Sequence, residues 1–260
     1  MAPLHAVLSP ALSDTTFTVR WAKTDKDVLM AQKLRALAFG FCPPGTPEDA
    51  IAPECDPFDA FARHLIVTDN RTGRCIGTYR VLDPAGARKA GGTYAETEFD
   101  LSALDPYRDR TLELGRSCVH PEHRQGGVIA LLWSALVQTL LAENMSYLMG
   151  CASVDLTDPT LDPDRIWTYL QDHVLETSVG PAIPHRPFLC VRRTLPDEAV
   201  PALPPLLKGY LRLGARIIGN PSHDPVFQTA DFPVWLPVSA INGRYVRHFF
   251  RREPGKESPV

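Results

Sequence analysis

The stretch Thr111–Ser153 decides the fold. It opens with TLELGRSCV at Thr111–Val119, turns at His120–Arg124 and reaches the glycine pair Gly126–Gly127. The residues that follow have the i, i+3, i+4, i+7 spacing of a core-facing helical stripe: Val128, Leu131, Leu132, Ala135, Leu136, Thr139 and Leu140. A second apolar strand returns at Ser146–Ser153. Strand, glycine loop, helix and parallel strand together predict a βαβ unit, and the start of its helix can bind an anion.

The first strand carries two charged residues three positions apart. In a regular strand Glu113 and Arg116 would point to opposite faces. Gly115 lies between them, and a glycine inside a strand often marks a bulge. A bulge of one residue would turn both side chains to the same face. The alternative is a plain ion pair on the face of the sheet.

The glycine pair suggests a site for a phosphate. Gly126 and Gly127 would expose backbone N–H groups, and Arg124 adds a positive charge beside them. No Gly-Lys-Ser/Thr follows Gly127, which excludes a P-loop, and no Gly-x-Gly precedes it, which excludes a dinucleotide fingerprint. A tight turn without a ligand is the alternative.

Composition bounds the class of protein. The 260 residues form one large domain or two small ones, and the formal charge of -3 argues against a nucleic-acid binder. Cysteines are scattered without a Cys-x-x-Cys, which predicts reduced thiols in a cytoplasmic protein. Met1–Asp14 lacks a basic segment followed by an apolar run, so we expect no signal peptide. No apolar run approaches the ~20 residues that a membrane span requires.

Local patterns predict one α/β domain at residues 17–245, with an N-terminal extension at 1–16 and a basic C-terminal tail at 246–260. The expected strands are Phe17–Ala22, His64–Thr68, Arg74–Leu82, Phe188–Arg192, Ala215–Ile218 and Phe232–Pro237. The expected helices are Thr24–Phe39, Arg165–Glu176 and Leu203–Leu213. Cys42–Pro57 is expected to be an irregular, mobile segment over the site, Asp83–Gly92 a loop, and Thr93–Asp109 a partly helical connection.

The glycine loop resembles the phosphopantetheine loop of the GNAT-type N-acyltransferases, Arg/Gln-x-x-Gly-x-Gly/Ala. Arg124 and Gly127 match it, whereas Ile129 stands where the last Gly or Ala is expected. This departure would crowd the diphosphate of coenzyme A and suits a donor with a single phosphate, such as acyl carrier protein. The resemblance implies a GNAT-type fold: a mixed central sheet with a bulged, splayed strand pair, flanked by helices.

Other charged positions are similar to motifs of the acyl-homoserine lactone synthases, a GNAT-like family that takes acyl groups from acyl carrier protein. The matching residues are Arg35, Phe39, Asp56, Asp59, Arg80, Glu113 and Arg116. The tryptophan that this family has after the first helix has no counterpart here, because Cys42-Pro43-Pro44 occupies that region.

Longer strings resemble the ornithine-lipid acyltransferases, from about Arg20 to Tyr245. The strings are ELGRSCVHP at Glu113–Pro121, LLW in the helix, GCAS at Gly150–Ser153 and LPPLLKGYLRLGA at Leu203–Ala215, with Asp224, Phe227, Thr229 and Asp231 after them. The resemblance implies transfer of a 3-hydroxyacyl group from acyl carrier protein to the α-amine of ornithine, giving lyso-ornithine lipid without a bound cofactor.

The expected roles follow from this chemistry. The amine must be neutral to attack a thioester, so Glu113 is expected to take its proton, with Arg116 holding Glu113 or the substrate carboxylate. The donor is expected at the backbone N–H groups of Cys118 and Val119 and at the loop residues Arg124, Gly126, Gly127 and Val128. The expected substrate-binding residues are Arg35, Phe39, Asp56, Asp59 and Arg80. Asp56 and Asp59 either receive the ornithine side-chain ammonium or order the Pro-rich segment by pairing with Arg35 or Arg80.

Three further features have competing interpretations. Cys118, with His120 or His123 as base, is either a nucleophile or a buried, inert thiol, and its apolar strand favours the second. His120-x-x-His123 contains Pro121 and lacks a third ligand in the sequence, so no metal site is expected. The basic and aromatic residues of the tail, from Arg244 to Lys256, suggest contact with the anionic inner face of a membrane, or else a solvated tail.

Rival functions remain at this stage. An acyl-homoserine lactone synthase that uses S-adenosylmethionine is disfavoured by the extra segment Leu203–Leu236, and an acetyl-CoA N-acetyltransferase by Ile129. A non-catalytic module that binds acyl carrier protein would keep the fold without the reaction. The acceptor could be ornithine, lysine, glutamine or glycine. Lys208, Arg212 and Arg216 are candidates for docking the acidic carrier protein.

Overall fold

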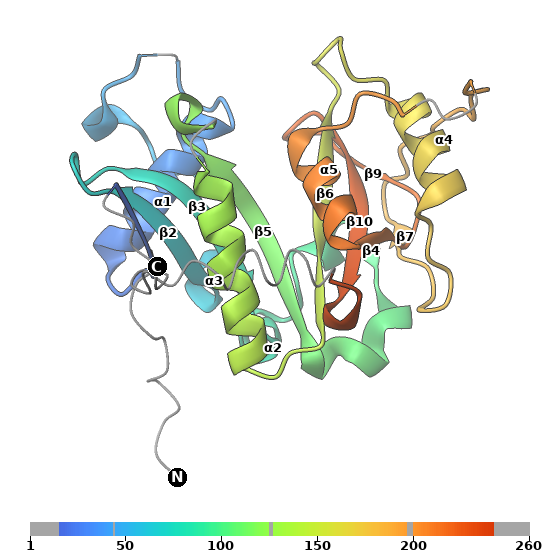
Figure 1. Ribbon diagram of the computed structural model, residues 1–260, viewed down its shortest axis with the longest axis horizontal. Helices are drawn as coiled ribbons and strands as arrows, with labels where there is room; N and C mark the ends of the chain where they lie inside the picture. The colour runs from blue at the N-terminus through green and yellow to red at the C-terminus, as the bar shows by residue number, and fades with distance from the viewer. Residues whose placement is uncertain (1–15, 44, 125–126, 197–199, 242–260) are drawn as a thin grey trace, which may run out of the picture. The chain divides into compact units, whose positions relative to one another are not determined.

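The computed structural model describes residues 16–43, 45–124, 127–196 and 200–241 (Figure 1). The chain divides into two compact units. Within the described residues, unit 1 contains 16–82 and 115–145, and unit 2 contains 83–114 and 146–241. The strand β5 (Thr111–Val119) contributes its first residues to unit 2 and its last residues to unit 1.

Unit 1 is built on an antiparallel meander. The strands β1 (Phe17–Trp21), β2 (Arg63–Asp69) and β3 (Cys75–Leu82) pair in that order, with Val19 opposite Val67 and Val67 opposite Gly77. The predicted hairpin is therefore confirmed. Its turn is held by the Asp69 carboxylate, which accepts a hydrogen bond from the Arg71 N–H at 2.7 Å.

Two long helices belong to unit 1. The helix α1 (Asp25–Ala38) begins after its N-cap Thr24, which forms a capping box with Asp27. The helix α3 (Val128–Ala142) packs on the sheet where β3 has a glycine: a Cβ on Gly77 would lie 2.5 Å from Val128 Cγ1. The short 3-10 turns η1 (Glu48–Ala50), η2 (Pro57–Phe61) and η5 (Pro121–His123) complete the unit.

The Pro-rich segment of unit 1 follows the predicted irregular path, apart from Pro44, which lies outside the described residues. Its second half is fixed to α1: the Glu54 N–H donates to the Gln32 carbonyl at 3.1 Å, and Ile51 is buried. These contacts give the segment a defined position on the helix that carries Arg35.

Unit 2 contains the mixed part of the sheet. The strand β6 (Tyr147–Asp155) runs parallel to β5 from Thr111 opposite Tyr147 to Glu113 opposite Met149, which confirms the predicted parallel return. A Cβ on Gly150 would lie 2.3 Å from the Leu114 carbonyl oxygen, so only glycine permits this close approach. The long strand β10 (Thr229–Pro237) pairs antiparallel with β6 and also with β8 (Arg216–Ile217) and β9 (Ser222–Asp224).

The remaining elements of unit 2 cover this sheet. They are α2 (Pro84–Ala90), η3 (Ala95–Thr97), β4 (Phe99–Asp100), η4 (Ser102–Arg110), α4 (Pro163–His173), β7 (Ile183–Pro184), α5 (Pro205–Leu213) and η6 (Val238–Ala240). One core cluster gathers Phe99, Leu101, Leu104, Met149 and Trp235. Burial of such residues contributes the main stabilising free energy of the unit.

Two local predictions are wrong. Asp83–Gly92, expected to be a loop, contains α2, because the Asp83 carboxylate caps the Gly86 N–H at 2.7 Å and Gly91 ends the helix with φ of 81°. Phe188–Arg192, expected to be a strand, has Leu189 86% exposed and is bound to α4 instead: the Val191 N–H donates to the Asp164 carboxylate at 2.9 Å. Among the described residues, none of the helices combines the length and apolar character needed to cross a membrane.

Candidate active site

The strand β5 is interrupted at the predicted place. Arg116, next to Gly115, has φ of 50°, a left-handed conformation that is uncommon for a residue with a Cβ. Such a residue disturbs the alternation of a strand, as a bulge does. Because Glu113 belongs to unit 2 and Arg116 to unit 1, the expectation that they share a face stays a prediction.

Unit 1 brings three guanidinium groups and three carboxylates into one network. Arg35, which is fully buried, donates to both oxygens of Asp59 at 2.9 and 2.8 Å and pairs through its Nε with Glu54. Its Nη2 also donates to the Glu54 backbone carbonyl at 2.7 Å. Gln32 adds a hydrogen bond to Asp59 at 2.9 Å. The helix α1 thus anchors the segment that follows it through one side chain.

Arg80 and Arg116 extend this network from the sheet. Arg80 Nη1 lies 2.5 Å from each Asp56 oxygen and 3.1 Å from Asp59 Oδ1. Arg116 contacts Asp56 at 2.8 Å and Glu54 at 3.3 Å. Asp56 also accepts the Phe58 N–H at 2.9 Å and thereby starts η2. The predicted pairing of Asp56 and Asp59 with Arg35 and Arg80 is therefore present; their contact with a substrate stays a prediction.

The network keeps the Asp59 carboxylate charged. Burial alone would raise the pKa of Asp59, but the hydrogen bonds and charge of Arg35 hold that pKa well below its usual range. Three positive and three negative side chains balance, so the network has no net formal charge. We name the residues Arg35, Glu54, Asp56, Asp59, Arg80 and Arg116 the arginine network. Sequence reasoning assigned no role to Glu54 and Gln32, although Glu54 lies two residues before Asp56.

The predicted donor residues lie in the second part of unit 1. Gly127 is the N-cap of α3 with φ of 74°, which glycine adopts without steric cost, and Val128 behind it is buried. Arg124 is exposed and Val119 is half-buried. Gly126 lies outside the described residues. The first turn of α3 has no side-chain cap, so its N–H groups are suited to bind a phosphate oxygen.

Cys118 and Phe39 belong to the hydrophobic core of unit 1. Cys118 is buried in a core cluster with Ile66 and Cys75, and Phe39 packs against the same cluster. Burial raises the pKa of the Cys118 thiol, which disfavours the thiolate that a nucleophile needs. This supports the prediction of an inert cysteine.

Glu113 has a role in unit 2 that the sequence did not reveal. It is buried, and its two carboxylate oxygens accept the backbone N–H groups of Tyr94, at 2.9 Å, and Ala95, at 2.7 Å. These hydrogen bonds hold the start of η3.

Two groups of side chains bring three potential metal ligands within 4.8 Å of one another: His120, Glu122 and His123 in unit 1, and Glu98, Asp224 and Asp231 in unit 2. In the first group, burial and the charge of Arg74 lower the pKa of His120, and Arg74 Nη2 lies 3.1 Å from His120 Nε2. A guanidinium at that distance opposes a metal ion. The expectation of no metal stays a prediction.

The second group is acidic and buried, and we name Glu98, Asp224 and Asp231 the acidic cluster. Burial and the charges of Asp231 and Asp224 raise the pKa of Glu98 to about 9. Burial also raises the pKa of Asp231. Tyr94, whose N–H holds Glu113, directs its hydroxyl to Asp224 Oδ2 at 3.4 Å.

We expect replacement of Glu98 by glutamine to stabilise the protein more at pH 8 than at pH 5. The folded state retains a proton on Glu98 that the unfolded state releases, so stability falls as pH rises from about 4.5 to about 9. Glutamine removes that dependence. The difference in Tm between variant and wild type, measured by calorimetry, should therefore increase with pH; a constant difference would contradict the raised pKa.

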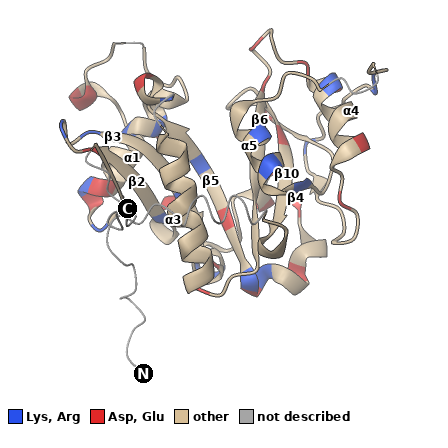
Figure 2. Ribbon diagram, viewed as in Figure 1, with Lys and Arg blue, Asp and Glu red and all other residues tan. Residues whose placement is uncertain are grey.

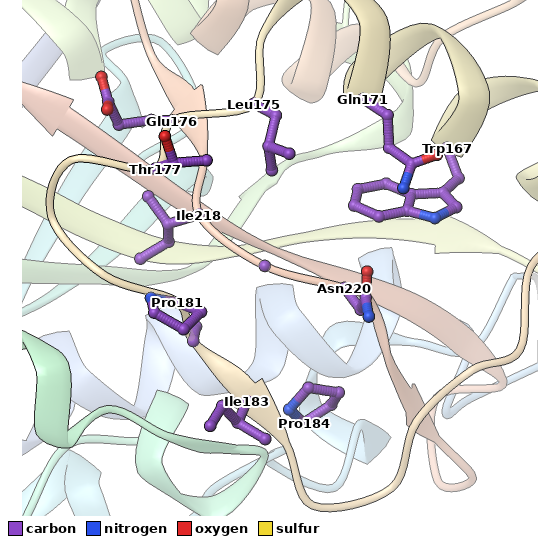
Figure 3. Close-up of a pocket in the computed structure, with 12 residues that line it drawn as sticks. Trp167, Gln171, Leu175, Glu176, Thr177, Pro181, Ile183, Pro184, Ile218 and Asn220 are labelled. Carbon is purple, nitrogen blue, oxygen red and sulfur yellow. The ribbon is translucent and has the colours of Figure 1, made fainter.

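Unit 2 also has an apolar pocket of about 360 Å³ (Figure 3). Its lining includes Trp167, Leu175, Ile183, Pro184 and Ile218. The volume is within the ~300–1,000 Å³ typical of small-molecule sites, and the lining suits a hydrocarbon group. Sequence reasoning missed it because the lining comes from segments that do not form a contiguous motif.

The fold and the matching family model define the class of protein. Residues 34–134 match the model described as an acetyltransferase (GNAT) domain, so the class is GNAT acyltransferase. The L-ornithine N(alpha)-acyltransferase of Rhodobacter capsulatus is 30% identical over 95% of this chain and 99% of that protein. The protein of the same name from Rhizobium meliloti is 33% identical over 80% of this chain and 74% of that protein. The chain belongs to the L-ornithine Nα-acyltransferase family.

A solved structure is also similar. The crystal structure of the AHL synthase LasI aligns with 87% of this chain and 95% of that chain, at 15% identity and a TM-score of 0.49.

Proposed function

We propose that this enzyme transfers a 3-hydroxyacyl group from acyl carrier protein to the α-amine of ornithine, forming lyso-ornithine lipid in the first step of ornithine lipid synthesis. The observation that carries the proposal is the similarity to a protein named L-ornithine N(alpha)-acyltransferase along 99% of that protein's length. Similarity of this extent includes both units.

The reaction replaces the C–S bond of the thioester by a C–N bond and moves one proton from the amine to the thiol. The neutral α-amine attacks the thioester carbonyl carbon, the C–S bond breaks, and the amine proton leaves as the carrier thiol is released. We assign the proton to Glu113, directly or through one water, because it is a carboxylate whose two oxygens are oriented by the N–H groups of Tyr94 and Ala95. The N–H groups at Cys118 and Val119 are proposed to meet the thioester oxygen.

The donor is proposed to bind at the start of α3. Arg124, Gly126, Gly127 and Val128 would receive the single phosphate of phosphopantetheine, using the uncapped N–H groups after Gly127. In unit 1, Arg35, Phe39, Asp56, Asp59 and Arg80 are proposed to contact the substrate, and the ion pairs of the arginine network are proposed to fix the segment that carries Asp56 and Asp59. No cofactor is required, because the acyl group arrives as an activated thioester.

The donor is the first point to test. With ornithine as acceptor, release of free thiol should be at least ~10-fold faster with 3-hydroxyacyl-acyl carrier protein than with the coenzyme A thioester of the same acyl group. Equal or faster release with coenzyme A would overturn the assignment of the donor. No release with either donor would overturn the proposed activity.

The carrier protein is proposed to dock on α5. Lys208 and Arg212, four residues apart on this helix, are both exposed, as is Arg216 after it (Figure 2). Acyl carrier protein is acidic, and such a stripe would steer its approach. The proposal also places the enzyme in the cytoplasm, where the basic tail 246–260, which lies outside the described residues, would contact the inner face of the membrane.

Charge reversal on α5 should weaken docking without affecting chemistry. The double variant Lys208→Glu, Arg212→Glu is expected to raise KM for the acyl-carrier donor about 10-fold, because like charges would then face the carrier. With acyl-pantetheine, which lacks the carrier, its rate should equal that of wild type. Lys89→Glu, an exposed reversal on α2, is the matched control. An unchanged KM in the double variant would exclude α5 as the docking surface.

A further inference from the structure

Within the described part of the chain, two residues of the acidic cluster, Glu98 and Asp231, have buried carboxylate oxygens without a hydrogen-bond donor. Glu98, Asp224 and Asp231 are 1%, 5% and 3% exposed. Among the described residues, neither oxygen of Glu98 nor Oδ1 of Asp231 has a hydrogen-bond partner, and the same holds for the buried hydroxyl of Thr229, on the same face of β10 as Asp231. Buried polar oxygens without a partner, here on Glu98, Asp231 and Thr229, are costly unless a ligand binds them.

We propose that Glu98, Asp224 and Asp231 bind the side-chain ammonium of a diamino acid, which is the acceptor of the reaction proposed above. This inference rests on the proposed function and assigns the residues that select the acceptor. It gives the ornithine ammonium a site other than Asp56 and Asp59, whose oxygens are already engaged by arginines.

The geometry fits an ammonium. An ammonium group has three N–H donors and no acceptor. Three acceptors about 2.8 Å from a tetrahedral nitrogen are about 4.6 Å apart. One oxygen from each of the three residues lies within 4.8 Å of the other two, which permits this spacing. The carboxylates come from the end of η3, from β9 and from β10, so they approach a ligand from separate elements.

The occupied atoms of the cluster disfavour a divalent metal. Asp224 Oδ1 accepts the N–H groups of Val226, at 2.7 Å, and Phe227, at 3.1 Å, and Oδ2 accepts the Tyr94 hydroxyl. These bonds leave few lone pairs for coordination. Mg²⁺ and Ca²⁺ require about six to eight oxygen ligands, which is more than these three carboxylates offer.

The position of the cluster relates it to Glu113 within unit 2. Glu113 of β5 lies opposite Met149 of β6, and Asp231 of β10 lies opposite Ser153 of β6. Met149 and Ser153 are four residues apart on one strand, so their side chains, and those of Glu113 and Asp231, lie on the same face of the sheet. Tyr94 joins the two points, because its N–H donates to Glu113 and its hydroxyl to Asp224. A diamino acid on this face would direct its side chain to the acidic cluster and its α-amine toward Glu113.

Proton release gives a signature of this binding. Without a ligand, burial and the negative charges of Asp231 and Asp224 keep a proton on Glu98 at neutral pH. The other titratable group that faces Glu98 is Tyr94. An ammonium would replace that proton. Calorimetry of ornithine binding at pH 7.5 in buffers of different ionisation enthalpy should show release of about one proton, and Glu98→Gln should abolish this release.

Acceptor selection is the decisive test. Wild type should prefer ornithine to norvaline, which lacks only the side-chain amine, by at least ~100-fold in kcat/KM, because norvaline leaves the carboxylates unpaired. Asp231→Asn should reduce this preference to less than ~10-fold, mainly through KM for ornithine, with KM for the acyl donor unchanged. Asp109→Asn, at a carboxylate of the same unit whose side chain is 86% exposed, is the control. If Asp231→Asn does not fold, Glu98→Gln is measured in its place.

The outcomes separate this inference from the proposed function. Acylation of ornithine by wild type with the same preference in the cluster variants would overturn the inference and leave the function standing. Acylation of neither amino acid by wild type would overturn the function itself. Binding of Mg²⁺ or Ca²⁺ by wild type, detected by calorimetry and lost in Asp231→Asn, would replace the ammonium by a metal and overturn the inference.

Discussion

Replacing Arg35 with methionine should lower the free energy of unfolding by about 3–5 kcal/mol, because the buried carboxylate of Asp59 loses its bidentate partner and Glu54 loses its shortest ion pair. Arg35 is fully buried and is the bidentate partner of Asp59 and a partner of Glu54. Methionine fills much of the side-chain volume but supplies no donor. The loss should appear as a lower denaturation midpoint in urea, followed by circular dichroism.

The matched control for this variant is Arg88→Met. Arg88 pairs with Asp109 at 2.7 Å, but the two side chains are 65% and 86% exposed. An exposed pair contributes about 0–1 kcal/mol, so this variant should differ little from wild type. A loss below about 1 kcal/mol for Arg35→Met would show that the arginine network does not hold the segment around Glu54 and Asp59.

Replacing Glu113 with glutamine should reduce kcat by at least ~100-fold, the usual contribution of a positioned proton acceptor. The amide cannot take the proton of the amine. It also presents an NH₂ group where the carboxylate accepted the N–H of Tyr94 or Ala95, so stability should fall by about 1–3 kcal/mol. Thiol release at saturating ornithine and donor, measured on protein shown to be folded, gives kcat.

Glu48→Gln is the control for amide substitution, because Glu48 is exposed and pairs only at 3.3 Å with the exposed Arg74. Its kcat should equal that of wild type. If folded Glu113→Gln has the kcat of wild type but a lower stability, Glu113 only holds the start of η3 and does not take the proton of the amine.

Local signals predicted much of the fold. The capping box of Thr24 and Asp27 and the apolar stripe of α3 are contained within a few residues each, so the sequence displays them directly. The Asp83, Pro84 and Gly91 signals of α2 are equally local and were available, but were interpreted as a loop. Phe188–Arg192 differs, because its apolar residues suggest a strand while contacts with α4 determine its path.

Partners distant in the chain were harder to predict. The family motifs identified Arg35, Asp59 and Arg80 as site residues. Asp59 is 24 positions from Arg35 and 21 from Arg80, so its contacts with them depend on the path of the Pro-rich segment. The hydrogen bonds of Glu113 come from η3, 18 and 19 residues earlier. Glu98 belongs to none of the motifs, and only the pairing of β9 with β10 and the path of η3 bring it to Asp224 and Asp231.

The measurement that tests the central claim most directly is mass spectrometry of the product formed by purified protein, 3-hydroxyacyl-acyl carrier protein and ornithine. The proposed function predicts a product with the mass of ornithine plus the 3-hydroxy fatty acid minus one water, whose fragments locate the acyl group on the α-nitrogen. Acylation only at the side-chain nitrogen, or recovery of ornithine unchanged beside intact donor, would contradict it.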